Sequence, residues 1–283
     1  MTTAQHYLLL SVDKFKAELD ACRPLPPLTV ASLRRKLSLN WTYNSNAIEG
    51  NTLTLLETKV VIEDGITIGK KTMREHLEAI NHGEAIQFVE DLVTKAEPIN
   101  EWNIRNIHQL VLKGIDQENA GQYRNVDVEI TGASFTPPTH FVLPDKMAEL
   151  MRWYREDAQQ LHPIDRAAQL HTRFVEIHPF VDGNGRTARL LLNFELMREG
   201  YPVAIILRED RLDYFKALEK ACVERDYTDF TEMVANRVMR SLNLYLAVSA
   251  NKEYQQHLSD ADNKNFEAPE KLPPSFVDND PAP

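Results

Sequence analysis

Apolar side chains recur at helical spacing along most of the chain. Residues 32–50, 72–95 and 144–157 each place such side chains on one face of a helix. Residues 186–199 have the same periodicity and are followed by Gly200, a residue type that commonly ends helices. The pattern therefore predicts an all-α fold.

Two helix starts are marked by capping residues. Thr54 stands three residues before Glu57, which is the spacing of a capping box and predicts a helix within residues 52–65. Asn100 is suited to cap a helix that Gly114 then ends. Both signals agree with the hydrophobic periodicity.

Residues 124–144 interrupt the helical pattern. Val126, Val128 and Ile130 alternate with acidic residues, which is the period of a β-strand. Gly132 and a following pair of prolines indicate a turn and an irregular return. We predict a short β-hairpin that lies across the helical core as a flap.

The composition excludes several classes of protein. With 42 acidic and 32 basic residues in 283, the chain has a formal net charge of −10, which argues against binding to nucleic acid or to an anionic membrane. No apolar run approaches the length of a membrane span. Cys22 and Cys222 are far apart and in no metal-binding spacing, so we expect a reducing, cytoplasmic location.

The stretch HPFVDGNGRTAR, residues 178–189, has the most distinctive chemistry of the chain. Its centre is the turn Gly183, Asn184 and Gly185. This turn leads into a helix, whose N-terminal N–H groups and dipole attract anions. Arg186 and Arg189 are three positions apart, so we expect them to project from the same side of the first turn. Exposed amides beside two guanidinium groups predict a site for a polyphosphate.

At this stretch the sequence resembles the Fic family, whose signature H-x-F-x-[DE]-G-N-G-R-x-x-R is matched at every defined position. The resemblance covers roughly residues 95–240 and includes the G-x-x-R of Gly121 and Arg124. It implies an all-α Fic fold, with a helical core, one β-hairpin flap and additional N-terminal helices. It also implies a protein adenylyltransferase, which transfers AMP from ATP to a Ser, Thr or Tyr hydroxyl of a target protein.

The resemblance gives the residues of the stretch their roles. His178 is implied to be the general base for the attacking hydroxyl. Asp182 is implied to hold Mg²⁺, and Gly183, Asn184 and Gly185 to form an anion hole. Arg186 and Arg189 are implied to hold the terminal phosphates.

Three further contacts follow from the resemblance. Thr131 and Gly132 of the flap are expected to approach the nucleotide, and Tyr214 or Phe215 to pack on adenine. Cys222 stands where many adenylyltransferases have asparagine, so the nucleotide preference stays open.

The target is expected as an extended segment paired along the flap. Self-modification and a homodimer are further expectations.

Upstream, SNAIEGN (45–51) resembles the family's inhibitory motif [ST]-x-x-x-E-[GN], as in the subclass with an N-terminal inhibitory helix. Ser45 and Glu49 share a helical face. The Glu49 carboxylate is expected to reach Arg189 and occupy the γ-phosphate site. Glu49 is also placed to position a water molecule for the reverse reaction, removal of AMP.

These features divide the chain into three regions. Residues 1–95 form an N-terminal helical region with the inhibitory motif, and residues 96–250 form the catalytic core. Residues 251–283 are acidic, rich in proline and poor in aliphatic side chains, which predicts an irregular C-terminal extension.

Two other functions remain open at this point. A metal-dependent phosphohydrolase would use His171, His178 and Asp182 as ligands, but it leaves Asn184 and the two arginines without a role. A nucleotide-sensing regulator without transferase turnover would be held off by Glu49 and act through a partner. Relatives that transfer UMP, phosphocholine or a whole phosphate leave the transferred group open as well.

Overall fold

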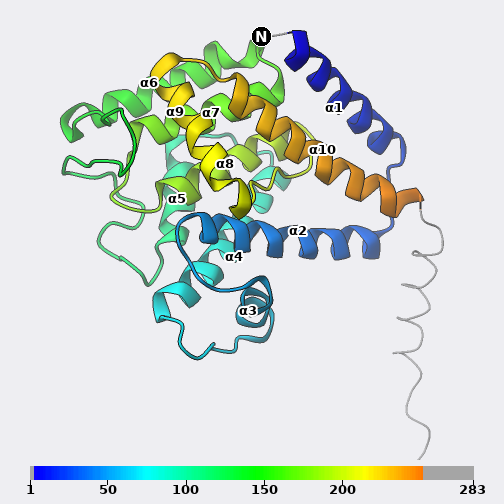
Figure 1. Cartoon of the computed structure of the whole chain (residues 1–283), viewed down its shortest axis with the longest axis horizontal. Helices are drawn as coiled ribbons and strands as arrows, with labels where there is room; N and C mark the ends of the chain where they lie inside the picture. The colour runs from blue at the N-terminus through cyan, green and yellow to red at the C-terminus, as the bar shows by residue number, and fades with distance from the viewer. Residues whose placement is uncertain (1–2, 251–283) are drawn as a thin grey trace, which may run out of the picture.

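The computed structural model describes residues 3–250, which form helices joined by loops (Figure 1). The extension predicted for residues 251–283 lies outside the described residues. Within the described part of the chain there is no β-strand, and the all-α prediction is confirmed. None of the described helices is long and apolar enough to cross a membrane.

Ten α-helices and four shorter helical turns lie within residues 3–250. The helices are α1 (Thr3–Ala21), α2 (Pro27–Ile48), α3 (Leu55–Lys59), α4 (Met73–Thr94), α5 (Glu101–Val111), α6 (Leu143–Glu156), α7 (Pro163–Ile177), α8 (Asn184–Arg198), α9 (Arg211–Glu224) and α10 (Thr228–Ala250). The turns are η1 (Val60–Asp64), η2 (His140–Val142), η3 (Ala158–Gln160) and η4 (Arg208–Asp210).

The predicted helix starts are present in the structure. The Thr54 hydroxyl accepts a hydrogen bond from Glu57 N at 3.2 Å, and Glu57 Oε2 accepts one from Thr54 N at 2.7 Å, which completes the capping box. The Asn100 side chain accepts from Asn103 N at 2.8 Å at the start of α5. Helix α3 is shorter than the predicted segment, because the chain continues from it as the π-helical turn η1.

Helix α8 lies at the centre of the fold (Figure 1), and its residues from Arg186 to Leu196 are all buried. A helix buried on all sides needs apolar neighbours all round. One apolar cluster contains Leu190 and Phe194 of α8 together with Trp41 of α2. A second contains Leu192 of α8 and Val12 of α1. Both clusters therefore combine side chains from before and after residue 95.

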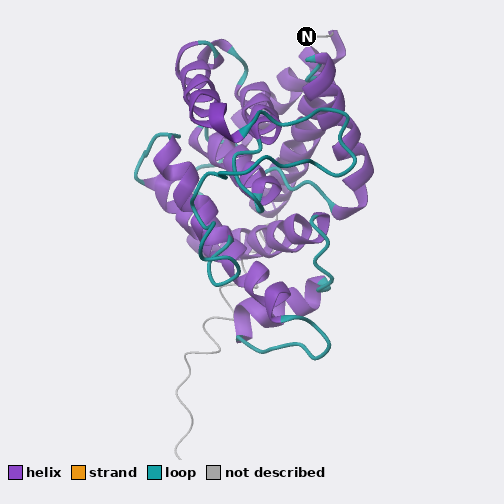
Figure 2. Cartoon of the chain, turned by 90° about the vertical axis from the view of Figure 1, so that its left-hand side faces the viewer, coloured by secondary structure: helices purple, strands orange, loops and turns teal. Residues whose placement is uncertain are grey.

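The β-hairpin prediction is wrong in its secondary structure: residues 125–139 form a loop, which lies among the long loops that cross the face shown in Figure 2. The chain does turn at Thr131 and Gly132, where Ala133 N donates to Ile130 O at 3.1 Å. Val126 is 49% exposed, so the alternation does not bury one face. The prolines of the returning segment also lack the N–H groups that a strand ladder needs.

Candidate active site

The loop between α7 and α8 turns on two residues with positive φ. His178 follows the last residue of α7 with φ 50° and ψ 58°, and Gly183 precedes α8 with φ 78°. Glycine adopts this left-handed conformation without a steric penalty, whereas histidine does so at a cost. The backbone conformation at His178 is therefore maintained by the contacts around it.

One of these contacts is made by the Asn184 side chain. Its Oδ1 accepts from Phe180 N at 3.0 Å, and its Nδ2 donates to Phe180 O at 2.8 Å. Both residues are buried, so these bonds satisfy groups that water does not reach. The asparagine of the turn closes the loop with its side chain.

Arg124 connects this loop to the start of the flap, which we define as the loop of residues 125–139. Its Nε donates to His178 O at 2.8 Å, and its backbone N donates to Pro179 O at 3.0 Å. Its Nη1 donates to Val126 O at 2.9 Å. A single buried guanidinium thus fixes the backbone carrying His178 and the first residues of the flap.

His108 of α5 contacts the loop between α7 and α8. Gly121 N donates to its Nδ1 at 2.9 Å, so its Nε2 carries the proton and donates to Asp182 O at 2.9 Å. Its ring stacks on Phe180 with 3.5 Å between centroids. Burial lowers the pKa of His108 to about 4, so the ring is neutral at physiological pH. No local sequence pattern identifies this residue, because only the three-dimensional contact distinguishes it from an ordinary helix histidine.

Arg189 of α8 binds residues at the C-terminal end of α2. Its Nη2 donates to Glu49 Oε1 at 2.7 Å and to Ser45 O at 2.8 Å, and its Nε donates to Ser45 Oγ at 3.0 Å. Its Nη1 lies 3.4 Å from Tyr214 Oη. Burial alone would lower the pKa of Arg189, but the Glu49 carboxylate and Tyr214 together outweigh it and raise that pKa. The structure thus brings Ser45, Glu49 and Arg189 together.

The Glu49 carboxylate also lies directly against the first turn of α8. A Cβ placed on Gly185 would overlap Glu49 Oε1, so only glycine permits this approach. The carboxylate therefore sits where backbone N–H groups and the helix dipole favour negative charge. An acidic side chain of this chain thus lies where the sequence predicts an anion site.

Arg186 has different partners from Arg189. Its Nη2 donates to Asp182 Oδ1 at 3.2 Å, and its Nη1 lies 3.3 Å from Glu78 Oε1. Burial alone would raise the pKa of Asp182, but Arg186, the Gly183 amide and Arg74 together hold it below its ordinary value. The two arginines are thus both buried at the start of α8 but engage separate acidic groups.

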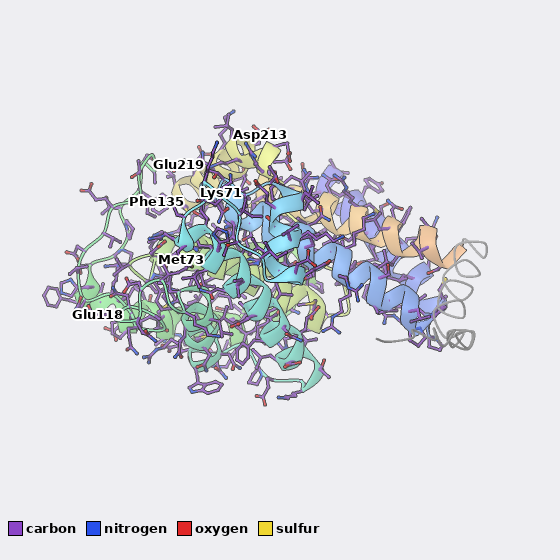
Figure 3. The ribbon with its side chains drawn as sticks, turned by 90° about the horizontal axis from the view of Figure 1, so that it is seen from below. Lys71, Met73, Glu118, Phe135, Asp213 and Glu219 are labelled. Carbon is purple, nitrogen blue, oxygen red and sulfur yellow. The ribbon has the colours of Figure 1, made fainter. Side chains whose placement is uncertain are left out.

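A cavity of about 860 Å³ opens beside His178. Its walls come from the flap turn, the start of α8 and one side of α9, and they include Glu49, Thr131, Gly132, His178, Gly185, Arg189, Tyr214 and Phe215. Ser134 N donates to Glu219 Oε1 at 2.9 Å and holds the flap against α9. Figure 3 shows Phe135 of the flap and Glu219 of α9 on the same face of the molecule.

The two aromatic candidates on α9 differ in exposure. Tyr214 is 1% exposed, and its Oη contacts His171 Nε2 at 3.0 Å, so it supports Arg189 from within the core. Phe215 is 40% exposed and has Arg211 over its ring. Of the two, Phe215 is the better placed to pack on a ligand. Cys222 is buried, and burial raises the pKa of its thiol to about 12, so it stays protonated.

The imidazole of His178 has one nitrogen available to act as a base. Its Nδ1 lies 3.3 Å from Val175 O, and a carbonyl only accepts, so Nδ1 carries the proton and Nε2 has the lone pair. Burial lowers the pKa of His178 below its ordinary value, and the positive charge of Arg124 lowers it further. A neutral imidazole at the wall of the cavity is suited to accept a proton.

The contacts do not bring together the ligands of a metal-dependent phosphohydrolase. His171 is fully buried, and its Nε2 is taken by Tyr214. Among residues 3–250 no three His, Cys, Asp or Glu side chains converge in a way that would hold a metal. Asp182 offers a carboxylate at the edge of the site, with a side chain that is 42% exposed.

Comparison with known proteins identifies similar chains. The model of the Fic/DOC family matches residues 98–196. A relative from Nematostella vectensis named protein adenylyltransferase Fic is 41% identical over 207 residues, which are 72% of this chain and 48% of the relative. One from Caenorhabditis briggsae, named protein adenylyltransferase fic-1, is 36% identical over 76% of this chain and 42% of its own length. The chain thus spans about half the length of these curated relatives.

Solved structures are similar over most of their length. Fic-1 (residues 134–508) from C. elegans has a TM-score of 0.79 at 32% identity, covering 87% of this chain and 72% of that one. A Fic-domain-containing signalling protein from Bacteroides thetaiotaomicron has a TM-score of 0.77 at 31% identity, covering 84% of this chain and 96% of the other. The predicted Fic fold is confirmed by these similarities, with the flap as a loop.

Proposed function

This chain belongs to the Fic/DOC family, and on that premise we propose that it is a protein adenylyltransferase, which transfers AMP from ATP to a hydroxyl side chain of a target protein. Relatives that are 36–41% identical carry that name. The single observation that supports the proposal most is the Glu49 carboxylate bound at Arg189 and against Gly185, because it marks an anion site beside the neutral imidazole of His178.

In the proposed reaction, His178 Nε2 accepts the proton of the target hydroxyl as that oxygen bonds to the α-phosphorus of ATP. The bond from this phosphorus to the bridging oxygen of the β-phosphate breaks, and pyrophosphate leaves. Arg189 and Arg186 hold the terminal phosphates and stabilise the charge that develops on the leaving group. The backbone N–H groups at the start of α8, from Gly183 to Gly185, donate hydrogen bonds to negatively charged phosphate oxygens without rearrangement of the loop.

We propose Asp182 as the residue that holds Mg²⁺. Its carboxylate oxygens are the ligand type that magnesium prefers, and Oδ2 already binds a cation, the guanidinium of Arg74, at 2.5 Å. When bound, the ion would offset negative charge on the phosphates. The protein's own part is to keep Asp182 ionised, which its lowered pKa supports.

In the proposed regulation, residues 1–95 inhibit the catalytic core of residues 96–250. Glu49 neutralises Arg189 and fills the position that the γ-phosphate needs, so ATP cannot bind in a productive pose. Release of Glu49 then opens the site. Glu49 is also placed to position a water molecule against an AMP-modified side chain, which would give the reverse reaction.

The target is proposed to lie in an extended conformation along the flap, with its hydroxyl at His178. Thr131 and Gly132 line the cavity and are proposed to contact the nucleotide, with Phe215 against the base. Self-modification, a homodimer and a cytoplasmic location belong to the same proposal. Cys22 and Cys222 are both free thiols, one exposed and one buried.

The test uses the Glu49→Gly variant, magnesium and ATP labelled in turn at the α- and the γ-phosphate, with a mixture of candidate proteins. Label on protein is expected from α-labelled ATP only, and mass spectrometry is expected to find one AMP on a Ser, Thr or Tyr. Label from γ-labelled ATP would indicate phosphate transfer instead. Nucleotide binding without label on any protein would favour a nucleotide-sensing regulator.

The pH dependence of the reaction gives a separate prediction. A general base acts in its neutral form, so activity persists at neutral pH and is lost as the pH falls through the pKa of His178. Because burial lowers that pKa, the acid limb of kcat/KM for ATP in the Glu49→Gly variant is expected to have its midpoint below pH 6.5. A midpoint at or above pH 6.5 would contradict the assigned environment of His178.

A further inference from the structure

Four charged side chains form a closed ring at the edge of the candidate site. Arg74 binds Asp182 Oδ2 at 2.5 Å through Nη2 and Glu78 Oε1 at 3.1 Å through Nε. Arg186 lies 3.2 Å from Asp182 Oδ1 and 3.3 Å from Glu78 Oε1. This charge ring alternates in sign and is neutral as a whole. Two of its members, Arg74 and Glu78, come from α4, and no local sequence pattern marks either of them.

The members of the charge ring differ in burial. The side chains of Arg186 and Glu78 are 3% and 11% exposed. Those of Arg74 and Asp182 are 57% and 42% exposed. An ion pair in contact with solvent contributes little free energy and exchanges readily. The bond between Arg74 and Asp182 is therefore the part of the ring that another cation can displace.

We propose that Arg74 is a positioning residue that stands in for magnesium at Asp182, so that its displacement sets the magnesium concentration at which the nucleotide binds. The inference rests on the proposed function, in which Asp182 holds the metal. Arg74 presents one positive charge to the oxygen that the ion needs. Magnesium must then compete with this guanidinium, and it gains less from Asp182 than it would from a free carboxylate.

The charge ring is also connected to the inhibitory motif. Asn51, two residues after Glu49, donates from Nδ2 to Glu78 Oε2 at 3.0 Å. Asn46 donates from Nδ2 to Glu78 O at 3.2 Å. The region before residue 95 thus places a carboxylate on Arg189, where a phosphate belongs, and a guanidinium on Asp182, where the metal belongs. In the absence of magnesium nucleotide, Glu49 therefore compensates the charge of Arg189, and Arg74 compensates the charge of Asp182.

The test measures the magnesium requirement of binding, separately from turnover. In the Glu49→Gly background, α,β-methylene ATP is bound at increasing MgCl₂ in a calorimeter, with and without Arg74→Gln. The substitution is expected to lower the half-saturating magnesium concentration about two- to fivefold. Arg74→Lys keeps the charge and is expected to stay close to the parent value. Arg35→Gln on α2 removes an exposed charge away from the ring and serves as the matched control.

An unchanged or raised magnesium requirement in Arg74→Gln would overturn the inference. A fall of equal size in Arg35→Gln would also overturn it, because the effect would then come from net charge. Thermal unfolding of each variant checks that the fold is retained. If the parent Glu49→Gly protein binds no magnesium nucleotide at all, the proposed function fails instead, so the two outcomes are distinguishable.

Discussion

Glu49→Gly is expected to raise nucleotide transfer about ten- to hundredfold over the unsubstituted chain. The substitution removes a charge-assisted hydrogen bond to the buried Arg189, and such a bond is worth about 1.5–3 kcal/mol. It also vacates the space against Gly185 that a phosphate oxygen would need. Transfer is measured as α-labelled AMP incorporated into protein per unit time at fixed ATP and magnesium.

Two further variants separate the charge of Glu49 from its volume. Glu49→Gln keeps the side-chain size without the charge and is expected to raise transfer less than glycine does. Glu97→Gly removes an exposed carboxylate from the loop before α5 and is expected to leave transfer unchanged. Equal transfer by the unsubstituted chain and Glu49→Gly would show that Glu49 does not inhibit transfer.

His178→Ala in the Glu49→Gly background is expected to reduce transfer about 10²- to 10⁴-fold, which is the usual contribution of a general base. His178 is the only histidine among the described residues that line the cavity beside Gly185 and Arg189, and its Nε2 has the lone pair. Without it the target hydroxyl has no imidazole to accept its proton. The rate is measured at saturating magnesium nucleotide, so that a change in affinity does not enter.

The fold of the His178 variant needs its own control, because this residue has φ 50°. Asparagine tolerates the left-handed conformation better than alanine does. His178→Asn is therefore expected to retain the thermal stability of the parent and still lose transfer. His6→Ala on α1 removes an exposed histidine far along the chain and is expected to leave transfer intact. Substantial transfer by a folded His178→Asn would exclude this residue as the base.

Local chemistry made much of the helical fold predictable from the sequence. The capping box of Thr54 and the cap of Asn100 act within three residues, so the pattern of residue types specifies them. The helix ends at Gly50 and Gly200 follow from a backbone conformation that suits glycine, since both have positive φ. The hairpin failed because alternation over residues 126–130 does not show whether a second strand will pair with them.

The candidate site was predictable only where its residues are close in sequence. Residues 178–189 contain the loop, the helix start and both arginines, and the motif locates them together. The roles of His108 and Arg74 come from contacts with Asp182 across 74 and 108 positions of sequence. Nothing in the local pattern around either residue distinguishes it from an ordinary helix position. Burial also distinguishes Tyr214, which lies in the core, from Phe215, which is exposed. The sequence alone does not show which side of α9 is buried.

The central claim is that the start of α8, with Arg189, forms a polyphosphate site that Glu49 fills in the resting protein. Calorimetry with magnesium α,β-methylene ATP tests it most directly, using Glu49→Gly and the double variant Glu49→Gly, Arg189→Gln. Saturable binding to the first and at least about tenfold weaker binding to the second are expected. No binding to Glu49→Gly, or binding that is indifferent to the loss of Arg189, would contradict the claim.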